Sequence, residues 1–352
     1  MTRHSITRVI GTLLIVMLSA CGSDKNATLP TEAESALLLS YLENNGDILN
    51  GPGLPSLINA EDVHRLLHGT NIHIIDLRET DAFNAGHIPH SVNVLPSEVL
   101  YHFENVIDPS SFDYIVLVCP DAMLSGYVNA VMLFLGYDNV YALRYGLSSW
   151  DMEIAKDYWL AAMSSHLENK LVTTFNPKNK PGPLPALATG ETNGYRILRK
   201  RAEEILNIDP ALLDIDLDSL LHYPDNFYLV NYWPVGLYEQ GHLPGAIQYT
   251  PKLSLRSDQD INTLPVDQPI AIYCFTGHHS SYVTAFLRLL GYEAVNFSYG
   301  ANAFIHHTML TTQVESRTFT EDHVHHYPLS GRDEVALPEQ RQDESLPIGG
   351  GC

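Results

Sequence analysis

The sequence predicts an α/β protein with two similar domains, each a small parallel sheet flanked by helices on both faces. The first observation is internal repetition. Gly86-His87-Ile88-Pro89 precedes Cys119 by 33 residues, and Gly241-His242-Leu243-Pro244 precedes Cys274 by the same interval. The second is that short β-rich apolar runs alternate with segments of helical spacing, as in parallel sheets covered by helices. An offset of 155 residues between the copies indicates a duplicated domain rather than a solenoid.

The first 20 residues have the pattern of a signal peptide. Arg3 and Arg8 give a positive start, and the apolar run 9–17 is too short to cross a bilayer. Leu18-Ser19-Ala20-Cys21 then resembles the lipobox of bacterial lipoproteins, which implies lipidation of Cys21. The alternative is an ordinary signal peptide with a chance cysteine. We expect an anchored protein of the bacterial cell envelope that faces the periplasm, and Gly22 favours the outer membrane by family analogy.

Composition limits the partners and the chemistry. The chain has 352 residues and a net charge of −21, so we expect neither nucleic acid nor polybasic contact with lipid. Its length behind the leader suits two domains. Of the four cysteines, Cys119 and Cys274 hold equivalent positions in the two copies. This indicates two site thiols, although a disulfide between them stays open at this point.

Residues 21–50 are expected to form a polar tether followed by a helix. Thr31 is placed to cap that helix, and Glu34, three residues later, completes a capping box. Gly51-Pro52-Gly53 then breaks the chain. The first domain is predicted over residues 51–170.

Apolar runs and helical spacing alternate in this first domain. Residues 114–118 are almost wholly apolar, as expected of a strand buried on both faces. Cys119 ends that strand, and Gly136 stops the next helix. The expected elements are a helix at 60–67, strands at 72–76, 92–94 and 114–118, a helix at 125–135 and a strand at 140–143.

The rest of the chain repeats this order. Residues 171–193 are rich in Pro, Gly and Asn and are predicted to be a linker. The second domain is predicted over residues 194–311, and residues 312–352 form an acidic tail that ends in Gly-Gly-Gly-Cys352. The expected elements are a helix at 194–206, strands at 227–232, 246–249 and 269–273, and a helix at 281–290.

Each repeated cysteine is expected at the carboxyl end of a central strand, just before a helix. Ligands gather at this edge of a parallel sheet, and the helix N-terminus favours anions, so we expect a thiolate of lowered pKa. In the second loop Gly277 permits a tight turn, and Ser280 is placed to cap the helix. Backbone N–H groups would then surround one sulfur, which suits a persulfide.

These motifs resemble those of the rhodanese family of thiosulfate and persulfide sulfurtransferases. Asp76-Leu77-Arg78 and the run from Gly86 to Asn93 resemble the family's first signature, and Gly241 to Ala246 repeats its second half. The loop from Cys274 to Ser280 resembles the active-site loop Cys-x-x-Gly-x-Arg-Ser, which is one residue shorter than in related phosphatases. The resemblance covers roughly residues 55–155 and 195–310, and it implies two rhodanese-like domains.

The resemblance also implies roles. Cys274 would be the nucleophile that forms the persulfide, and Cys119 would be a second site. Substrate binding is assigned to the remainder of the second loop: Phe275, Thr276, Gly277, His278, His279 and Ser280. The two histidines would hold an anionic donor, more strongly when protonated below about pH 6.5.

The first loop departs further from the family pattern. The family's loop arginine is replaced by His279 in the second loop and by Leu124 in the first. The first loop also lacks glycine and adds Asp121, whose carboxylate disfavours both a thiolate and an anionic donor. We therefore expect a degenerate site in which Cys119 is poorly active. The alternative is that Cys119 is simply a buried small hydrophobic residue at a strand end.

Four residues of the signatures are interpreted as structural. Asp76 and Arg78 are expected to form an ion pair that braces the strand end. His87 and His242 are expected to make hydrogen bonds within their loops rather than to act as bases.

The predicted function is transfer of sulfane sulfur from thiosulfate or a polysulfide to a thiol, cyanide or a protein acceptor, without metal or cofactor. Expected partners are the small anionic donor, the acceptor, and a membrane contacted through the lipid anchor only. Cys352, behind three glycines, is placed to accept the sulfur. Two alternatives stay open: a non-catalytic binding module of the same fold, and a thiol redox protein that uses Cys274 and Cys352. Histidine pairs in the tail lack a regular ligand spacing, so no metal site is predicted.

Overall fold

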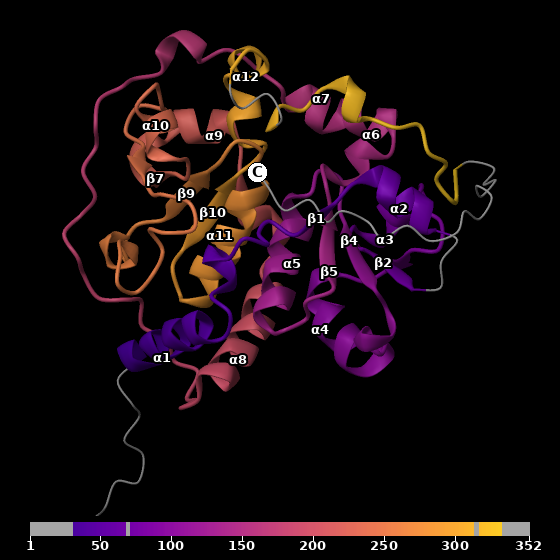
Figure 1. Cartoon of the computed structure of the whole chain (residues 1–352), viewed down its shortest axis with the longest axis horizontal. Helices are drawn as coiled ribbons and strands as arrows, with labels where there is room; N and C mark the ends of the chain where they lie inside the picture. The colour runs from indigo at the N-terminus through magenta and orange to yellow at the C-terminus, as the bar shows by residue number, and fades with distance from the viewer. Residues whose placement is uncertain (1–30, 68–70, 313–316, 333–352) are drawn as a thin grey trace, which may run out of the picture.

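The computed structural model describes residues 31–67, 71–312 and 317–332, and it confirms the predicted fold class. Two five-stranded parallel sheets lie side by side, with helices around them (Figure 1). Their strand orders are β1-β5-β4-β2-β3 and β6-β10-β9-β7-β8. The strands are β1 Leu57–Ile58, β2 Ile72–Asp76, β3 Val92–Asn93, β4 Tyr114–Val118, β5 Val140–Leu143, β6 Asp214–Ile215, β7 Tyr228–Asn231, β8 Ile247–Gln248, β9 Ile270–Tyr273 and β10 Ala294–Phe297.

The strands that precede the two cysteines, β4 and β9, are the central strands of their sheets. Both are almost wholly buried, which explains their continuous apolar sequence. The short edge strands β1 and β6, and β10 of the second domain, were not anticipated from the sequence. The helices are α1 Thr31–Asn44, α2 Ala60–Leu66, α3 Thr80–Asn84, α4 Val99–Tyr101, α5 Met123–Phe134, α6 Met152–Asp157, α7 Trp159–Ala162, α8 Gly194–Leu206, α9 Leu217–His222, α10 Val235–Tyr238, α11 His278–Leu289 and α12 His306–Leu310.

The two domains meet along α5 and α11, the helices that follow the two cysteine loops. At Gly126 the helices approach so closely that a Cβ would lie 2.4 Å from the Ser281 hydroxyl oxygen. Asn129 donates to the Tyr282 hydroxyl at 2.7 Å, and that hydroxyl donates to the Ser56 carbonyl at 2.9 Å. Polar bonds as well as close packing therefore join the domains.

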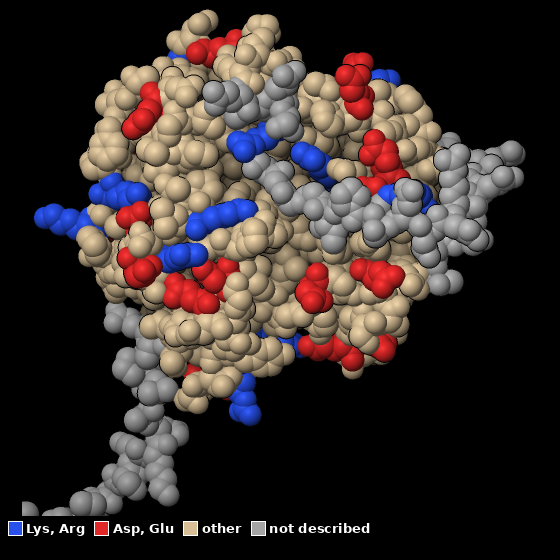
Figure 2. All heavy atoms as spheres, viewed as in Figure 1, with Lys and Arg blue, Asp and Glu red and all other residues tan. Residues whose placement is uncertain are grey.

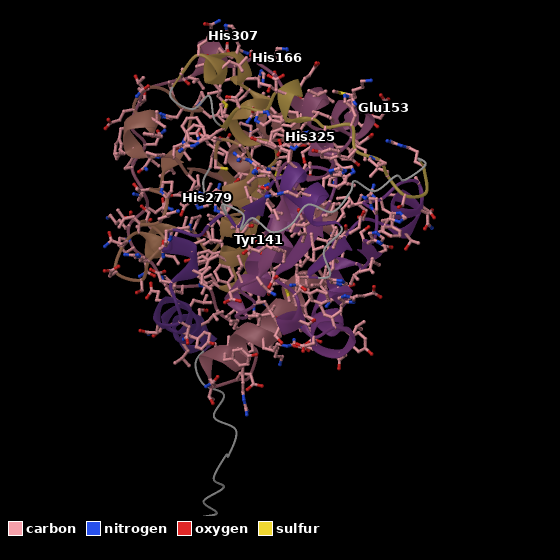
Figure 3. The ribbon with its side chains drawn as sticks, turned by 45° about the vertical axis from the view of Figure 1, so that its right-hand side comes forward. Tyr141, Glu153, His166, His279, His307 and His325 are labelled. Atoms are coloured by element: carbon pink, nitrogen blue, oxygen red, sulfur yellow. The ribbon has the colours of Figure 1, made fainter. Side chains whose placement is uncertain are left out.

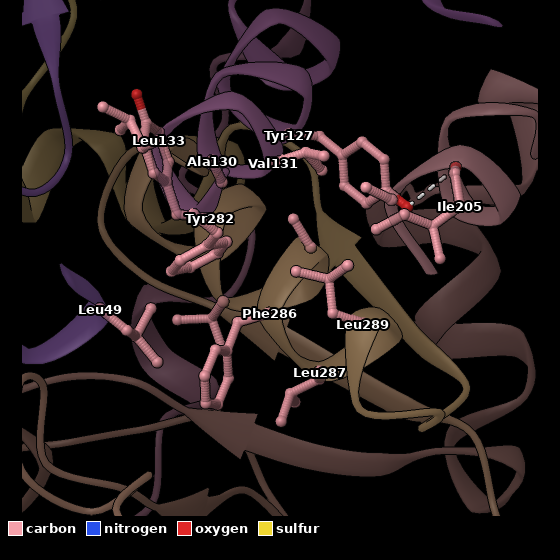
Figure 4. Close-up of a cluster of buried hydrophobic side chains, with 14 of the residues drawn as sticks. Leu49, Tyr127, Ala130, Val131, Leu133, Ile205, Tyr282, Phe286, Leu287 and Leu289 are labelled. Carbon is pink, nitrogen blue, oxygen red and sulfur yellow. Dashed lines mark hydrogen bonds between the residues drawn. The ribbon is translucent and has the colours of Figure 1, made fainter. Parts of the chain in front are cut away.

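One hydrophobic cluster continues across this seam (Figure 4). Tyr127 and Val131 of α5 pack in it with Phe286 and Leu289 of α11. The Tyr127 hydroxyl also donates to the Ile205 carbonyl at 3.2 Å. Because these side chains leave water together, separating the domains would expose apolar surface from both, so the two loops are held in a fixed relation.

The N-terminal helix α1 is hydrogen-bonded to the linker through Glu34. The Glu34 carboxylate accepts hydrogen bonds from the Thr189 N–H at 2.7 Å and the Gly190 N–H at 2.9 Å. Its oxygens are thus used 155 and 156 residues away. The Thr31 side chain, the other half of the predicted capping box, is outside the part of the structure that is described. The linker itself, residues 171–193, lies along the edge of the second domain (Figure 1).

The described part of the tail folds back onto the first domain. Residues 317–332 follow the second domain, yet Tyr327 donates to the Trp150 carbonyl at 3.1 Å, and Ser330 pairs with His87 in an antiparallel bridge. Phe319 is fully buried. The fading periodicity in this part of the sequence therefore marks an irregular segment that is nevertheless packed.

Some predictions lie outside the described residues. These are the leader at 1–20, the lipidated Cys21 and the terminal Cys352. Within the described ranges, no helix is both long and apolar enough to cross a membrane.

Candidate active site

The second cysteine loop joins the central strand to the helix at the domain seam. Cys274 follows β9 directly, and its side chain is 2% exposed. Gly277 has a φ of +82°, and a Cβ there would lie 2.6 Å from the Met123 sulfur and 2.9 Å from the Tyr299 nitrogen. The turn therefore requires glycine because of its backbone conformation and because Met123, from the first domain, packs against it.

Helix α11 begins at His278, three residues earlier than predicted. Ser280 is consequently inside the first turn, and the expectation that it caps the helix is wrong. Its hydroxyl donates to Asn296 Oδ1 at 2.5 Å and lies 3.5 Å from the Cys274 sulfur. Thr276 accepts a hydrogen bond from the His278 N–H at 3.3 Å.

A second turn packs against the backbone of each cysteine, and the sequence analysis did not predict it. Tyr299-Gly300 follows β10 with both residues at positive φ, and a Cβ on Gly300 would lie 2.3 Å from the Cys274 carbonyl oxygen. Tyr145-Gly146 follows β5 in the same conformation, and a Cβ on Gly146 would lie 2.4 Å from the Cys119 carbonyl oxygen. The Tyr-Gly pairs are 154 residues apart, so allowing a one-residue slip in the repeat would have found them.

The first loop holds a cysteine that burial keeps protonated. Cys119 is fully buried, and its sulfur accepts the Ser125 N–H at 3.4 Å. Burial, and then the Asp121 carboxylate, raise the pKa of the Cys119 thiol to about 12. For this cysteine the predicted lowering of the thiol pKa is wrong, since desolvation outweighs the helix N-terminus.

Asp121 is bonded across the domain seam. Its carboxylate accepts the Met123 N–H at 3.0 Å and the Tyr299 hydroxyl at 3.2 Å. The Trp159 indole donates to the Asp121 carbonyl at 3.0 Å. Burial raises the pKa of the Asp121 carboxyl as well. The added carboxylate of the first loop thus has a structural partner in the second domain.

The two loop histidines are buried and neutral. His278 contacts the rings of Tyr145 and Trp159, and His279 lies edge-on to Tyr232, with ring centroids 5.0 Å apart. Burial is the main reason that the pKa of each imidazole is lowered to about 3. The predicted protonation below about pH 6.5 is therefore wrong, because the folded environment removes water from both rings.

Positive charge reaches the second loop from outside it. Lys252, after β8, and Arg317, from the tail, both lower the pKa of His279 by charge repulsion. The Arg317 guanidinium lies 4.8 Å from the centre of the Phe275 ring. On the face shown in Figure 2, Lys and Arg side chains lie across the second domain and the seam, with acidic side chains scattered around them. Sequence reasoning missed both residues because neither is near the cysteine in the chain.

The strand-end residues differ between the domains. Arg78 forms a 2.7 Å ion pair with Asp76 and donates to the Gly86 carbonyl, also at 2.7 Å. In the second domain Trp233 takes the place of the arginine and stacks on Phe275 with ring centroids 4.6 Å apart. An ion pair in one domain is thus replaced by an aromatic stack beside the loop of the other.

The paired histidines of the Gly-His motifs occupy matching positions. His87 Nδ1 bonds the Phe83 carbonyl, and His242 Nδ1 bonds the Tyr238 carbonyl, each at 2.9 Å. Each ring stacks on the residue whose carbonyl it bonds. Neither contact involves a cysteine loop.

Other histidines are spread over the molecule. His166 and His307 lie at the top edge of the view in Figure 3, well away from His279 and His325. Within the described residues no group of three or more His, Cys, Asp or Glu side chains could hold a metal ion. Cys119 and Cys274 are both free thiols, so the disulfide left open above is not formed.

Comparison with known families agrees with the geometry. The model of the rhodanese-like domain matches twice, at residues 59–153 and 200–307, which is more than half of the chain. The chain belongs to the rhodanese-like domain family. The two matched segments contain one cysteine loop each, so the family assignment covers both.

Individual relatives of this rhodanese-like chain are distant. YibN of Escherichia coli is 26% identical over 94 residues, which cover 27% of this chain and 66% of YibN. The thiosulfate sulfurtransferase GlpE of Shewanella oneidensis is 30% identical over 94 residues, 26% of this chain and 89% of GlpE. A solved thiosulfate sulfurtransferase from Pseudomonas aeruginosa is 17% identical, with a TM-score of 0.28, over 89% of this chain and 50% of that one. The chain therefore spans about half to two thirds of the first relatives matched in each search.

Proposed function

We propose that this rhodanese-like protein transfers sulfane sulfur through a persulfide on Cys274. The Cys274 thiolate attacks the outer sulfur of thiosulfate, the S–S bond of the donor breaks, and sulfite leaves with the bonding pair. A thiol or cyanide then attacks the outer persulfide sulfur. The new S–S bond breaks, and its electron pair returns to Cys274 as thiolate, so the enzyme is unchanged.

The observation that carries this proposal is the environment of the second loop. Cys274 stands at the carboxyl end of the central strand, in the short family loop, and Lys252 and Arg317 bring positive charge to His279 of the same loop. Such charge attracts an anionic donor and stabilises the anion that forms on sulfur. The first loop instead presents the Asp121 carboxylate, which repels both, so we assign the activity to Cys274 and not to Cys119.

The proposal includes the surroundings expected from the sequence. The protein would be lipid-anchored at Cys21, face the periplasm and take a small sulfur anion as donor. Its acceptor would be a thiol or a partner protein, with Cys352 as an acceptor within the chain. These points rest on the sequence motifs alone.

The test is intact-mass analysis of the chain after incubation with thiosulfate, followed by cyanide. We expect one added sulfur that cyanide removes, lost in Cys274→Ala and retained in Cys119→Ala. Sulfur lost only in Cys119→Ala would overturn the assignment of the site. Cys352→Ser is expected to slow discharge to thiol acceptors, and unaltered transfer would remove Cys352 from the mechanism.

A non-catalytic binding module is the second candidate, because Cys274 is only 2% exposed and both loop histidines are neutral. No added sulfur on any variant, with thiosulfate or polysulfide, would favour it. A mass loss of two hydrogens on mild oxidation, absent from Cys274→Ala and Cys352→Ser, would instead favour the thiol redox function.

A further inference from the structure

A chain of side-chain hydrogen bonds leads from Cys274 to a carboxyl group on the edge strand of the second sheet. The Ser280 hydroxyl oxygen lies 3.5 Å from the Cys274 sulfur and 2.5 Å from Asn296 Oδ1. Asn296 Nδ2 in turn donates to Asp214 Oδ1 at 2.7 Å. Ser280, Asn296 and Asp214 belong to α11, β10 and β6, so three elements of one domain are linked.

The polarity of this chain follows from what each group can donate. A carboxylate only accepts, so the Asn296 amide must turn its nitrogen toward Asp214. The Met123 sulfur, 3.3 Å from the same nitrogen, is a second acceptor and favours the same orientation. Asn296 Oδ1 therefore faces Ser280 and takes its single hydroxyl hydrogen. Toward Cys274, Ser280 is left with lone pairs, which accept an S–H but cannot stabilise a thiolate.

We propose that Asp214 and Asn296 are positioning residues that fix the hydroxyl direction of Ser280 and thereby control whether it donates a hydrogen bond to the Cys274 sulfur. With Asp214 ionised, Ser280 favours the thiol. With Asp214 protonated, its O–H donates to Asn296 Oδ1, the amide turns over, and its N–H donates to Ser280. The Ser280 hydroxyl is then free to donate to a thiolate or persulfide. The only new covalent bond is the O–H bond of the proton taken up from solvent, and that proton stays on Asp214.

The carboxyl group is placed to change its charge near neutral pH. Burial, and then the Asp121 carboxylate, raise the pKa of Asp214 to about 7, against the opposing effects of Asn296, Ser298 and Arg288. Tyr299 also interacts with it electrostatically. Asp214, Arg288 and Glu293 also line a surface groove of about 620 Å³, so the residue adjoins space open to solvent.

The first domain lacks this chain and serves as a natural comparison. In β6 and β10, Asp214 pairs with Asn296, and the corresponding pair in β1 and β5 is Leu57 and Ala142. Both positions are apolar there, so no carboxyl or amide fixes the hydroxyl of Ser125. That hydroxyl lies 3.4 Å from the Cys119 sulfur. The control by a remote carboxyl is thus specific to the loop to which we assign the activity.

The test is the titration of the Cys274 thiol in the full chain. It is followed by ultraviolet absorbance of the thiolate and referenced to Cys274→Ala. This inference rests on the proposed function for its purpose, but the titration does not depend on sulfur transfer. In Asn296→Ala the Ser280 hydroxyl has two remaining acceptors, the Gly277 carbonyl at 3.1 Å and the sulfur. A charged sulfur is the stronger acceptor, so the thiolate fraction at neutral pH should rise about tenfold.

Asp214→Asn is nearly isosteric and guards against a folding defect in Asn296→Ala. This variant should also raise the thiolate fraction. It should remove the change in that fraction that the ionisation of Asp214 causes near pH 7. Ser280→Ala should cancel the effect of Asn296→Ala, because the hydroxyl that the amide directs is gone. An effect that persists without Ser280, or wild-type titration in both folded single variants, overturns the proposal.

Sulfur loading measured on the same samples separates the two proposals. A shifted titration without a persulfide would retain the positioning role and reject the sulfurtransferase. A persulfide with an unshifted titration would retain the sulfurtransferase and reject the positioning role.

Discussion

The two cysteine loops share a backbone and differ in their chemistry. Three residues after each cysteine the chain is left-handed, with a φ of +77° at Ala122 and +82° at Gly277. A Tyr-Gly turn supports both loops. The side chains differ, however: Asp121 faces Cys119, whereas positive charge lies beside the loop of Cys274. A duplicated fold can therefore keep the shape of a site while a few side chains decide which copy is able to hold an anion.

The largest expected difference concerns the buried histidines, whose first-loop counterparts are Met123 and Leu124. The folded-state pKa of His278 and of His279, about 3, lies below the unfolded value of 6.5, so stability is complete above 6.5 and lost as the pH falls below it. At about pH 5 each imidazole should cost about 2 kcal/mol of unfolding free energy. His278→Met with His279→Leu should remove this loss of about 4 kcal/mol. Urea unfolding at several pH values measures it, with the exposed His307→Gln as control, and equal pH slopes would contradict it.

The next prediction separates backbone strain from crowding at the turn. Gly277→Ala should destabilise the fold by about 3 kcal/mol, because its Cβ would meet Met123 and the Tyr299 backbone. Gly245→Ala is the matched control: φ is +80° but nothing lies within 4 Å, so about 1 kcal/mol is expected. Urea unfolding gives both values. Equal losses of unfolding free energy in the two variants would mean that the contact with Met123 of the first domain adds nothing to the cost at Gly277.

A smaller effect is expected from the charges that reach the second loop. Lys252→Ala or Arg317→Ala should slow sulfur loading from thiosulfate about tenfold, which corresponds to about 1.4 kcal/mol. Loading from an uncharged organic trisulfide should change less. Lys178→Ala is the control, since that lysine pairs with Asp260. If all three variants lost activity equally, the argument for an anion-attracting loop would fail.

The smallest effect should come from relieving the left-handed alanine of the first loop. Ala122→Gly removes about 1–2 kcal/mol of strain but adds unfolded-state entropy worth about 0.5–1 kcal/mol. A gain of about 0.5 kcal/mol in unfolding free energy is expected. Ala130→Gly, within α5, should instead lose about 1 kcal/mol. A loss at Ala122 would show that the loop backbone is not strained.

Sequence repetition and periodicity were enough to predict two parallel α/β domains and the place of each cysteine. A buried central strand must be apolar throughout, and β4 and β9 are. The tight turn at Gly277 was also predicted correctly. Only glycine tolerates both the positive φ and the close contacts at this position. The two-residue edge strands were not predicted, since two residues show no period.

The electrostatics of the loops were decided by the tertiary structure. The sequence placed histidines beside Cys274 and a helix after each cysteine, but burial lowers the pKa of both imidazoles and raises that of the Cys119 thiol. Lys252 and Arg317 act on His279, and Asp214 bonds Asn296, from distant segments of the chain. Glu34 likewise bonds the linker 155 residues away. The local pattern determined which backbone forms, whereas desolvation and long-range contacts, which exist only after folding, determined the charge of each group.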